Sequence, residues 1–376
     1  MSRILILSCK DRLRLDEDDQ RFLTRRFLSN MSLVYISTTG DHAGQSLITW
    51  AISRRLLEKG INPGFFKPFG TGRMRVDNIW ADPDAFLFRE VLNIHEPLDM
   101  ICPFAEPENA EKQQRPKNIL DKIRKSAEHF LAGKDLLLIL GSKHIFFDDT
   151  LNSLPDISII SELNADLILL HRYRKLSTTL YSILSVHSLL REKVKGIIIN
   201  RVPLDKIEEV RRQIIPALHE KGILNISFIP EDPALSYRRL GEICDILDGN
   251  IIFGKDQLDN AIERMSVGAT NLCDDLLLFK RVYNKIVLLG PSNDCGIAGI
   301  IMTGNREPGE RVLEAVKKAN TPLVLIKEDS LEALERLEGV MPSLLPEDEN
   351  KAIYCAGIMD QSDSLNRLIE SIVSKP

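Results

Sequence analysis

Short apolar runs alternate with helix-length amphipathic stretches along most of the chain after Met31. The runs that predict buried strands are residues 33–37, 64–67, 136–140, 166–170, 196–200 and 227–229. Between them lie stretches that predict helices, such as residues 46–59 and 206–221, each followed by a glycine typical of a helix C-terminus. This alternation indicates a doubly wound α/β domain with a parallel sheet, in which ligands bind at the carboxyl ends of the strands.

A weak apolar region at residues 245–259, interrupted by glycines, separates this series from a second and shorter one. The second series has strands predicted at 285–289, 298–302 and 323–326, and helices predicted at 310–319 and 331–338. We therefore expect a first domain at residues 31–255 and a smaller α/β domain at residues 256–376 that includes the terminal helices. Residues 1–30 have mixed charge and no periodicity, so we interpret them as a non-core N-terminal extension; a regulatory arm is the alternative.

The composition is that of a globular protein. Of 376 residues, 44% are hydrophobic and 27% are charged, and no run of eighteen uncharged apolar residues could cross a bilayer. Lysine and arginine together number 49 against 54 acidic residues, so the net charge of -5 offers no bulk attraction for nucleic acid or an anionic membrane. The six cysteines form no C-x-x-C pair and the seven histidines show no ligand spacing, so no metal site is assigned. We expect a cytoplasmic protein.

The stretch between the first strand and the first helix is rich in small and polar residues. It contains Thr39, Gly40, Gly44, Gln45 and Ser46. At this place a G-x-x-x-x-G-K-[S/T] loop would cradle phosphates with its backbone N–H groups. Thr39 replaces the leading glycine and Gln45 replaces the lysine, which removes a charge but leaves a hydrogen-bond donor. We interpret the loop as a degenerate nucleotide site; the alternative is an ordinary turn in which Ser46 opens the helix.

Five further stretches identify a resemblance to a known family. They are GFFKP at 64–68, DPDA at 82–85 followed by EVL at 90–92, GIIINRV at 196–202, IPEDP at 229–233 and VGA at 267–269. In this order they resemble the dethiobiotin-synthetase-like P-loop domain at the front of long bacterial phosphate acetyltransferases. The same domain occurs in stand-alone proteins that pair it with a DRTGG domain. The resemblance covers most of the chain after residue 30.

The resemblance implies roles for three positions around the loop. It implies that Lys67 faces the phosphates and that Asn200 reads the adenine edge, so ATP or ADP is the expected cofactor. It also implies a magnesium-binding glutamate at the position that holds Leu140. Because phosphoryl transfer depends on positioning and charge neutralisation, losing both the loop lysine and this glutamate predicts little or no ATP hydrolysis. Whether Mg²⁺ binds is left open, with Asp77, Asp82 and Asp84 as alternative ligands, and no catalytic residue is assigned.

The second domain resembles the DRTGG domain over residues 271–338, although the naming motif is incomplete. Pro291 and Ser292 stand at its aspartate and arginine positions. We predict two strand-to-helix turns on neighbouring parallel strands, forming a crevice for a small anion. The residues of this predicted crevice are Gly290, Asp294, Thr303, Gly304, Asn305 and Arg306. The alternative is a pair of ordinary turns, with Asp294 as a cap and Arg306 solvated.

Together these features predict a regulatory, ligand-sensing protein of the phosphate acetyltransferase type that lacks the acetyltransferase catalytic domain. The expected ligand is a small anion or a nucleotide, and the expected protein partner is a phosphate acetyltransferase or a second copy of the chain. Two alternatives remain. One is an active ATP-dependent ligase that resembles dethiobiotin or cobyrinate a,c-diamide synthetase and uses Lys67 as its main phosphate contact. The other is a structural dimerisation module.

Overall fold

The computed structural model describes residues 32–72, 74–76, 79–105, 116–142, 144–146, 154–267, 285–290, 296–339, 344–360 and 364–373. The predicted extension at residues 1–30 lies outside these described residues. The chain divides into two compact units. The first comprises Met1–Glu231 and Leu344–Pro376, and the second comprises Asp232–Ser343. Along the chain, the second unit is therefore an insertion into the first.

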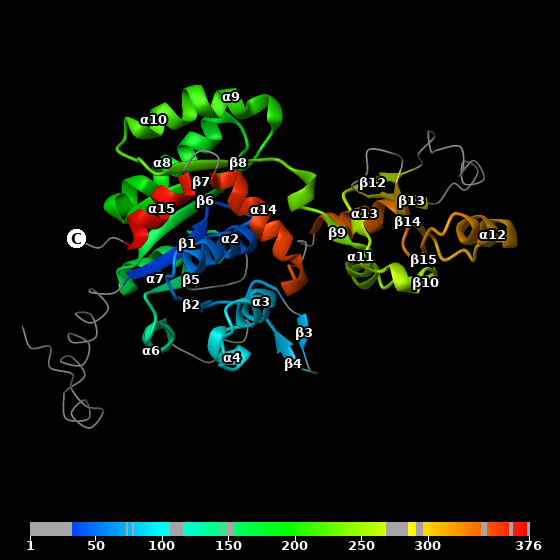
Figure 1. Ribbon diagram of the computed structural model, residues 1–376, viewed down its shortest axis with the longest axis horizontal. Helices are drawn as coiled ribbons and strands as arrows, with labels where there is room; N and C mark the ends of the chain where they lie inside the picture. The colour runs from blue at the N-terminus through cyan, green and yellow to red at the C-terminus, as the bar shows by residue number, and fades with distance from the viewer. Residues whose placement is uncertain are drawn as a thin grey trace, which may run out of the picture. The chain divides into compact units, whose positions relative to one another are not determined.

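The first unit is built on six parallel strands in the order β2-β5-β1-β6-β7-β8 (Figure 1). Their bounds are β1 (Ser32–Thr38), β2 (Pro63–Phe66), β5 (Leu136–Leu140), β6 (Asp166–Arg172), β7 (Val194–Val202) and β8 (Ile226–Pro230). Every residue of β1, β2 and β5 is buried, because a parallel sheet covered on both faces has no side open to solvent. The predicted doubly wound sheet is confirmed.

Helices and one small hairpin surround this sheet. These helices include α2 (Gln45–Glu58), α3 (Pro83–Val91), α4 (Leu98–Ile101), α6 (Pro116–Leu131), α7 (Asp156–Leu163), α8 (Leu176–Leu190), α14 (Glu349–Asp360) and α15 (Ser364–Val373). The hairpin pairs β3 (Met74–Val76) with β4 (Ile79–Ala81). As predicted, Gly60 follows the end of α2; it has a φ of 74° and donates its N–H to the carbonyl of Leu57.

The stretch predicted as one helix at residues 206–221 is irregular. It runs through a 3₁₀ turn, η3 (Leu204–Lys206), a short α9 (Ile207–Glu209), a π-helical turn, η4 (Val210–Ile214), and α10 (Ile215–His219). Pro216 has no N–H and cannot bond to the carbonyl four residues earlier, which explains the break in regular α-helical bonding. A second 3₁₀ turn, η2 (Arg191–Lys193), precedes β7.

The terminal helices α14 and α15 belong to the first unit. Right-handed crossovers place α2 on one face of the sheet, because β1 to β2 runs in the opposite direction to the later connections, whose helices cover the other face. The α2 face would then be bare over β7 and β8. Both terminal helices contact α2 and β8, and α15 also contacts β1 and β7. A Cβ on Gly196 in β7 would lie 2.2 Å from a methyl group of Leu368 in α15.

This packing differs from the expected domain boundaries, which placed residues 31–255 in one domain and residues 256–376 in another. The difference has two parts. The terminal helices lie with the first unit, and residues 232–255 lie with the second. Arg54 of α2 pairs with Glu349 of α14, and Arg55 of α2 pairs with Asp360. The chain order alone does not reveal such contacts, because they form only after the chain returns from the second unit.

The second unit contains a five-stranded sheet in the order β10-β15-β14-β13-β12. Its elements are α11 (Leu240–Ile246), β10 (Asn250–Phe253), β12 (Arg264–Val267), β13 (Lys285–Leu289), β14 (Ile297–Met302), α12 (Glu310–Lys318), β15 (Leu323–Leu325) and α13 (Ser330–Gly339). A two-residue pair joins β9 (Arg238–Arg239) to β11 (Ala261–Ile262). Short 3₁₀ turns are η5 (Pro233–Leu235), η6 (Lys255–Gln257) and, in the first unit, η8 (Pro346–Asp348).

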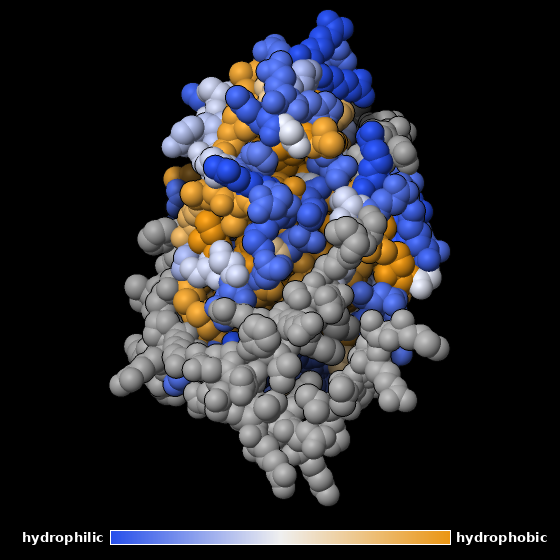
Figure 2. All heavy atoms as spheres, turned by 90° about the vertical axis from the view of Figure 1, so that its left-hand side faces the viewer, coloured by the Kyte–Doolittle hydropathy of each residue, from blue (hydrophilic) through white to orange (hydrophobic). Residues whose placement is uncertain are grey.

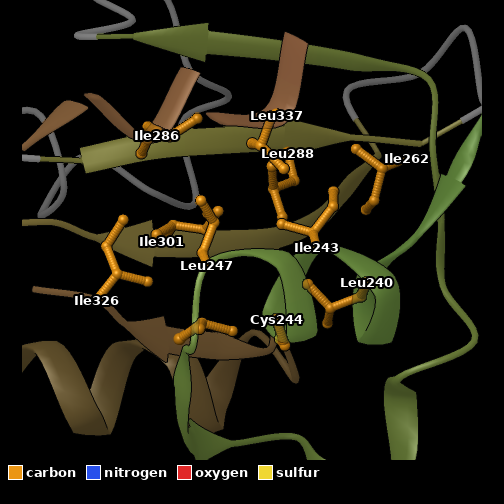
Figure 3. Close-up of a cluster of buried hydrophobic side chains, with 12 residues drawn as sticks. Leu240, Ile243, Cys244, Leu247, Ile262, Ile286, Leu288, Ile301, Ile326 and Leu337 are labelled. Carbon is orange, nitrogen blue, oxygen red and sulfur yellow. The ribbon is translucent and has the colours of Figure 1, made fainter. Parts of the chain in front are cut away.

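Side chains that alternate along the strands build two hydrophobic layers in this unit. Ile286 and Leu288 of β13 pack with α11 and α13 in one cluster. Figure 3 shows Ile243 of α11 and Leu247, the residue after this helix, pointing toward them. Val287 of the same strand packs with α12 in the other cluster. Period-two alternation is the expected pattern for a strand with a hydrophobic layer on each face.

The expected parallel pairing of the strands at residues 285–289 and 298–302 is wrong. Strands β13 and β14 are antiparallel, with Lys285 opposite Met302 and Leu289 opposite Ile297. Only residues 290–296 connect them, and such a short connection cannot carry the crossover that parallel neighbours need. Only β14 and β15, which are joined through α12, form a parallel pair in this sheet.

Hydrophobic side chains reach the surface of the first unit in several places. On α8, Tyr181 is 75% exposed and Leu189 is 61% exposed. On the face drawn in Figure 2, such apolar regions are interspersed with polar ones. In the described part of the chain, no helix has both the length and the apolar character needed to span a membrane.

The packing of α15 predicts where a core substitution acts. Leu368 is 3% exposed and lies against β7, so Leu368→Ala should lower the free energy of unfolding by about 2–5 kcal/mol. The loss should appear as faster hydrogen exchange in β1, β6 and β7, with β13 and β14 unchanged. As a control, Leu331→Ala at an exposed position of α13 should change stability by less than about 0.5 kcal/mol. Faster exchange confined to the second unit would contradict the assignment of α15.

Candidate functional site

The loop between β1 and α2 lies at the carboxyl edge of the first sheet. Gly44 directly precedes α2 and has a φ of 79°, a left-handed conformation that favours glycine. A Cβ at this position would lie 2.3 Å from Nδ2 of Asn200. Gly44 is therefore required both by the backbone conformation and by the close approach of a side chain from β7. Ser46 lies one residue inside α2 and is half-buried.

Gln45 ties the start of α2 to the neighbouring strand. Its Nε2 donates to the carbonyl of Gly141, 2.7 Å away at the end of β5, and lies 3.5 Å from the carbonyl of Ile36 in β1. The lysine of a complete phosphate loop would extend toward the phosphates from this position. Here the side-chain amide donor is directed to the protein backbone instead.

Lys67 follows β2 and is buried, with only 1% of its surface exposed. Its ammonium lies 2.9 Å from Oδ2 of Asp82, 2.5 Å from Oδ2 of Asp84 and 2.8 Å from Oγ1 of Thr71. Burial lowers the pKa of Lys67, but the charges of Asp82 and Asp84 outweigh it and raise the pKa above its ordinary value. The lysine is therefore a charged partner of two carboxylates.

Asp82 also organises the chain around Lys67. It is the N-cap of α3, and its carboxylate accepts from the backbone N–H groups of Asp84 and Ala85. The N–H of Thr71 donates to its other oxygen at 2.9 Å. One carboxylate thus fixes the start of a helix, a turn and the ammonium of Lys67.

Asn200 at the end of β7 is also bonded to the loop. Its Nδ2 donates to the carbonyl of Ala43 at 2.8 Å, and its Oδ1 accepts from the N–H of Arg201 at 2.8 Å. Both ends of the amide are therefore engaged within the protein. The role of Asn200 in reading an adenine edge stays a prediction.

His171 was not identified from the sequence. It is buried at the end of β6, where Nδ1 lies 2.6 Å from Oγ1 of Thr39 and Nε2 lies 3.1 Å from Oγ1 of Thr179. Burial, assisted by the charge of Arg174, lowers its pKa to about 4, so the ring is neutral at pH 7. Thr39 thus connects the loop to β6. A single histidine in an apolar strand gave no signal that would have revealed this contact.

Asp156 at the start of α7 was also missed. Its carboxylate is fully buried and accepts from Tyr35 at 2.9 Å, from Ser37 at 2.5 Å, and from the N–H and hydroxyl of Ser142. A Cβ on Gly141 would lie 2.2 Å from it, so the glycine leaves room for this carboxylate. Burial raises the pKa of Asp156 to about 6 against the effect of these donors.

The carboxylates of Asp82, Asp84 and Asp156 are already bonded to other groups of the protein. Leu140, at the position of the expected glutamate, is 1% exposed and packs in the core. Asp156 is surrounded by protein donors, and Asp82 and Asp84 are bound by Lys67. Asp77 lies outside the described residues. Within the described part of the chain, no three acidic, histidine or cysteine side chains converge on a point that could hold a metal.

The predicted crevice of the second unit is not assembled as expected. Because β13 and β14 are antiparallel, Gly290 and Thr303 lie at opposite ends of the strand pair. The N–H groups of Gly290, Gly304 and Asn305 donate to the carbonyls of Gly296, Glu328 and Ile326, so these backbone donors are used within the fold. Thr303 lies 3.1 Å from the hydroxyl of Ser330. Arg306 is exposed, and Asp294 lies outside the described residues.

Asp156 and His171 predict opposite effects of pH on stability. The pKa of Asp156 is raised in the folded protein, so the native state takes up a proton first and this group stabilises as pH falls from about 6 to 4. The pKa of His171 is lowered from 6.5 to about 4. The stability that its neutral ring contributes is therefore complete above pH 6.5 and is lost as the pH falls from 6.5 to about 4. Asp156→Asn should therefore steepen the loss of stability toward pH 4.

The matched variant His171→Asn should make the loss of stability toward pH 4 shallower or reverse it. Urea unfolding of the wild-type chain and both variants at half-unit steps of pH would measure the three slopes. Parallel profiles for all three proteins would contradict the assigned protonation states.

Three comparisons with known proteins bear on this site. The DRTGG domain family matches residues 242–340. A phosphate acetyltransferase of Synechocystis sp. is 24% identical over 92% of this chain and 52% of its own length. An ATP-dependent dethiobiotin synthetase of Clostridium perfringens is 28% identical over 57% of this chain and 98% of its own length. Among solved structures, the MinD cell division protein of Aquifex aeolicus aligns over 54% of this chain and 84% of its own, with 18% identity and a TM-score of 0.33.

These matches bear on each unit separately. The chain spans about half the length of the phosphate acetyltransferases it matches. The DRTGG match falls within the second unit, and it begins earlier in the chain than the predicted boundary at residue 256. Residues 242–340 thus match the DRTGG family, and the chain is also similar to a dethiobiotin synthetase and to about half of a phosphate acetyltransferase, the similarities that its sequence motifs predicted.

Proposed function

We propose that this chain is a cytoplasmic regulatory protein that binds a small anion or an adenine nucleotide and has little or no ATP hydrolysis. One observation carries the proposal. Three polar side chains expected to contact the nucleotide already have a protein partner: Gln45 bonds to Gly141, Lys67 to Asp82 and Asp84, and Asn200 to Ala43. Among the described residues, these three side chains therefore offer neither a free cation nor a metal ligand for phosphoryl transfer.

The charges around Lys67 support the same conclusion. One ammonium faces two carboxylates, so this group carries an excess of negative charge and does not attract a phosphate in the described arrangement. Contact between Lys67 and a phosphate would need the lysine to leave at least one buried carboxylate, and leaving a buried charge unpaired costs about 3–5 kcal/mol. We infer that Lys67 is a structural cation of the first unit.

We also propose which protein this chain regulates. The chain is similar over 92% of its length to about half of a phosphate acetyltransferase. We propose that it acts on an enzyme of that type or on a second copy of itself. The ligand would bind the first unit, and the DRTGG domain would take part in the response.

A second candidate function is an ATP-dependent ligase. It is favoured by the similarity to a dethiobiotin synthetase, which extends over 98% of that relative. In that case ligand binding must release Lys67 from Asp82 and Asp84, and the freed carboxylates would be available to Mg²⁺. The two functions differ in one measurable property, which is Mg²⁺-dependent release of phosphate.

Calorimetric titration with ATP, ADP and acetyl-CoA, with and without Mg²⁺, tests the proposal when phosphate release is assayed in parallel. We expect binding that does not require Mg²⁺ and is not accompanied by turnover. Turnover that depends on Mg²⁺ would favour the ligase. If none of the three ligands binds, the regulatory function proposed for this site is wrong.

Restoring the missing lysine should not restore activity. We expect Gln45→Lys to release phosphate no faster than the wild-type chain, because Leu140 provides no metal ligand and Lys67 stays paired with carboxylates. Gln45→Met is the matched control, since it removes the bond to Gly141 without adding charge and should lower the free energy of unfolding by about 1 kcal/mol. Robust ATP hydrolysis by the single lysine variant would refute the argument about the metal side.

A further inference from the structure

Arginines are concentrated at the carboxyl ends of β6 and β7, next to the loop. Arg172 ends β6 and stands opposite Asn200 in the register of the two strands, and Arg201 follows Asn200 in β7. Arg174 lies just beyond β6. Among the described residues, no carboxylate lies within 4.0 Å of the guanidinium groups of Arg172 and Arg201, unlike Lys67 on the other side of the loop. This edge of the sheet therefore carries cations that the protein does not pair.

The backbone at Arg201 has an unusual conformation. Arg201 has a φ of 54°, and the pairing of β7 with β8 shifts register between Ile199 and Val202. Asn200 holds this bulge through its side-chain bonds to Ala43 and Arg201, while its carbonyl accepts from the N–H of Tyr173 at 2.8 Å. Bulges redirect a side chain and are enriched beside functional sites, and a non-glycine residue in the left-handed region is strained. The fold thus places Arg201 in a conformation that an ordinary strand would not adopt.

The charges of Arg201 and Arg172 also repel each other. Burial lowers the pKa of the half-buried Arg201, and the charge of Arg172 lowers it further, while Glu231 acts in the opposite direction. Glu231 is exposed and stands at the end of β8. Two like charges at one partly buried edge are unfavourable without an anion between them.

We propose that Arg172 and Arg201 form a subsite for a phosphate group of the small anionic ligand. The planar fork of a guanidinium donates two parallel bonds to a phosphate, and two forks at one edge can neutralise a doubly charged group. The subsite lies on the β6 and β7 side of the loop, away from Lys67. It deepens the proposed ligand-sensing function and rests on it, because it supplies the free positive charge that Gln45 and Lys67 do not.

Calorimetry with inorganic pyrophosphate and with ADP, both without Mg²⁺ and at low ionic strength, tests the subsite. We expect Arg172→Gln and Arg201→Gln each to weaken binding by at least tenfold. The melting temperature without ligand should stay the same or rise, because each substitution removes a repulsion. Arg212→Gln is the matched control, because Arg212 is exposed and pairs with Glu208. This variant should bind both ligands as the wild-type chain does.

If Arg201→Gln lowers the melting temperature, Arg201→Asn is used in its place, since asparagine tolerates the left-handed conformation. Binding of ADP or pyrophosphate by the wild-type chain that neither arginine variant weakens would overturn the subsite and leave the ligand-sensing function standing. A wild-type chain that binds neither ligand would overturn both. Equal weakening by Arg212→Gln would show that only overall charge matters, and would also overturn the subsite.

Discussion

Two side-chain amides hold the loop between β1 and α2 from opposite sides. Gln45 reaches the carbonyl of Gly141 at the end of β5, and Asn200 reaches back from β7 to the carbonyl of Ala43. Between them, His171 of β6 fixes the hydroxyl of Thr39. These bonds join the loop after β1 and the start of α2 to the carboxyl ends of β5, β6 and β7 in one polar network. Because buried polar groups need partners, this network both stabilises the edge and uses the donors that a phosphate would otherwise accept from.

The strands of the first sheet were predictable because of how they are buried. Strands covered on both faces read as continuous apolar runs, and the runs beginning at Leu33, Leu136 and Asp166 lie inside observed strands. The loop position followed from the same pattern, since it comes directly after the first run. The irregular stretch around Pro216 was predicted as a plain helix. Its amphipathic pattern is helical, but the proline prevents continuous bonding.

The partners of the site residues were not predictable from local pattern. Gln45 and Gly141 are separated by 96 positions, and Ser37 and Asp156 by 119. Their contact depends on strand order, which a single sequence does not state. The antiparallel pairing of β13 with β14 is different, because the short connection at residues 290–296 was visible in the sequence and already excluded a parallel pair. The sequence did indicate Asp82 and Asp84, through the DPDA motif, but not that they would bind Lys67.

The return of the chain to the first unit has a consequence for its synthesis. The six strands of the first sheet, ending with β8 at Pro230, are made before the second unit, whereas α14 and α15 are made after it. Until residues 344–373 have left the ribosome, the apolar surface of β7 and β8 that these helices cover has no permanent neighbour. The inserted second unit, in contrast, can complete its own core before α14 and α15 have been made. The protein thus finishes folding in the reverse of the order in which its two units begin.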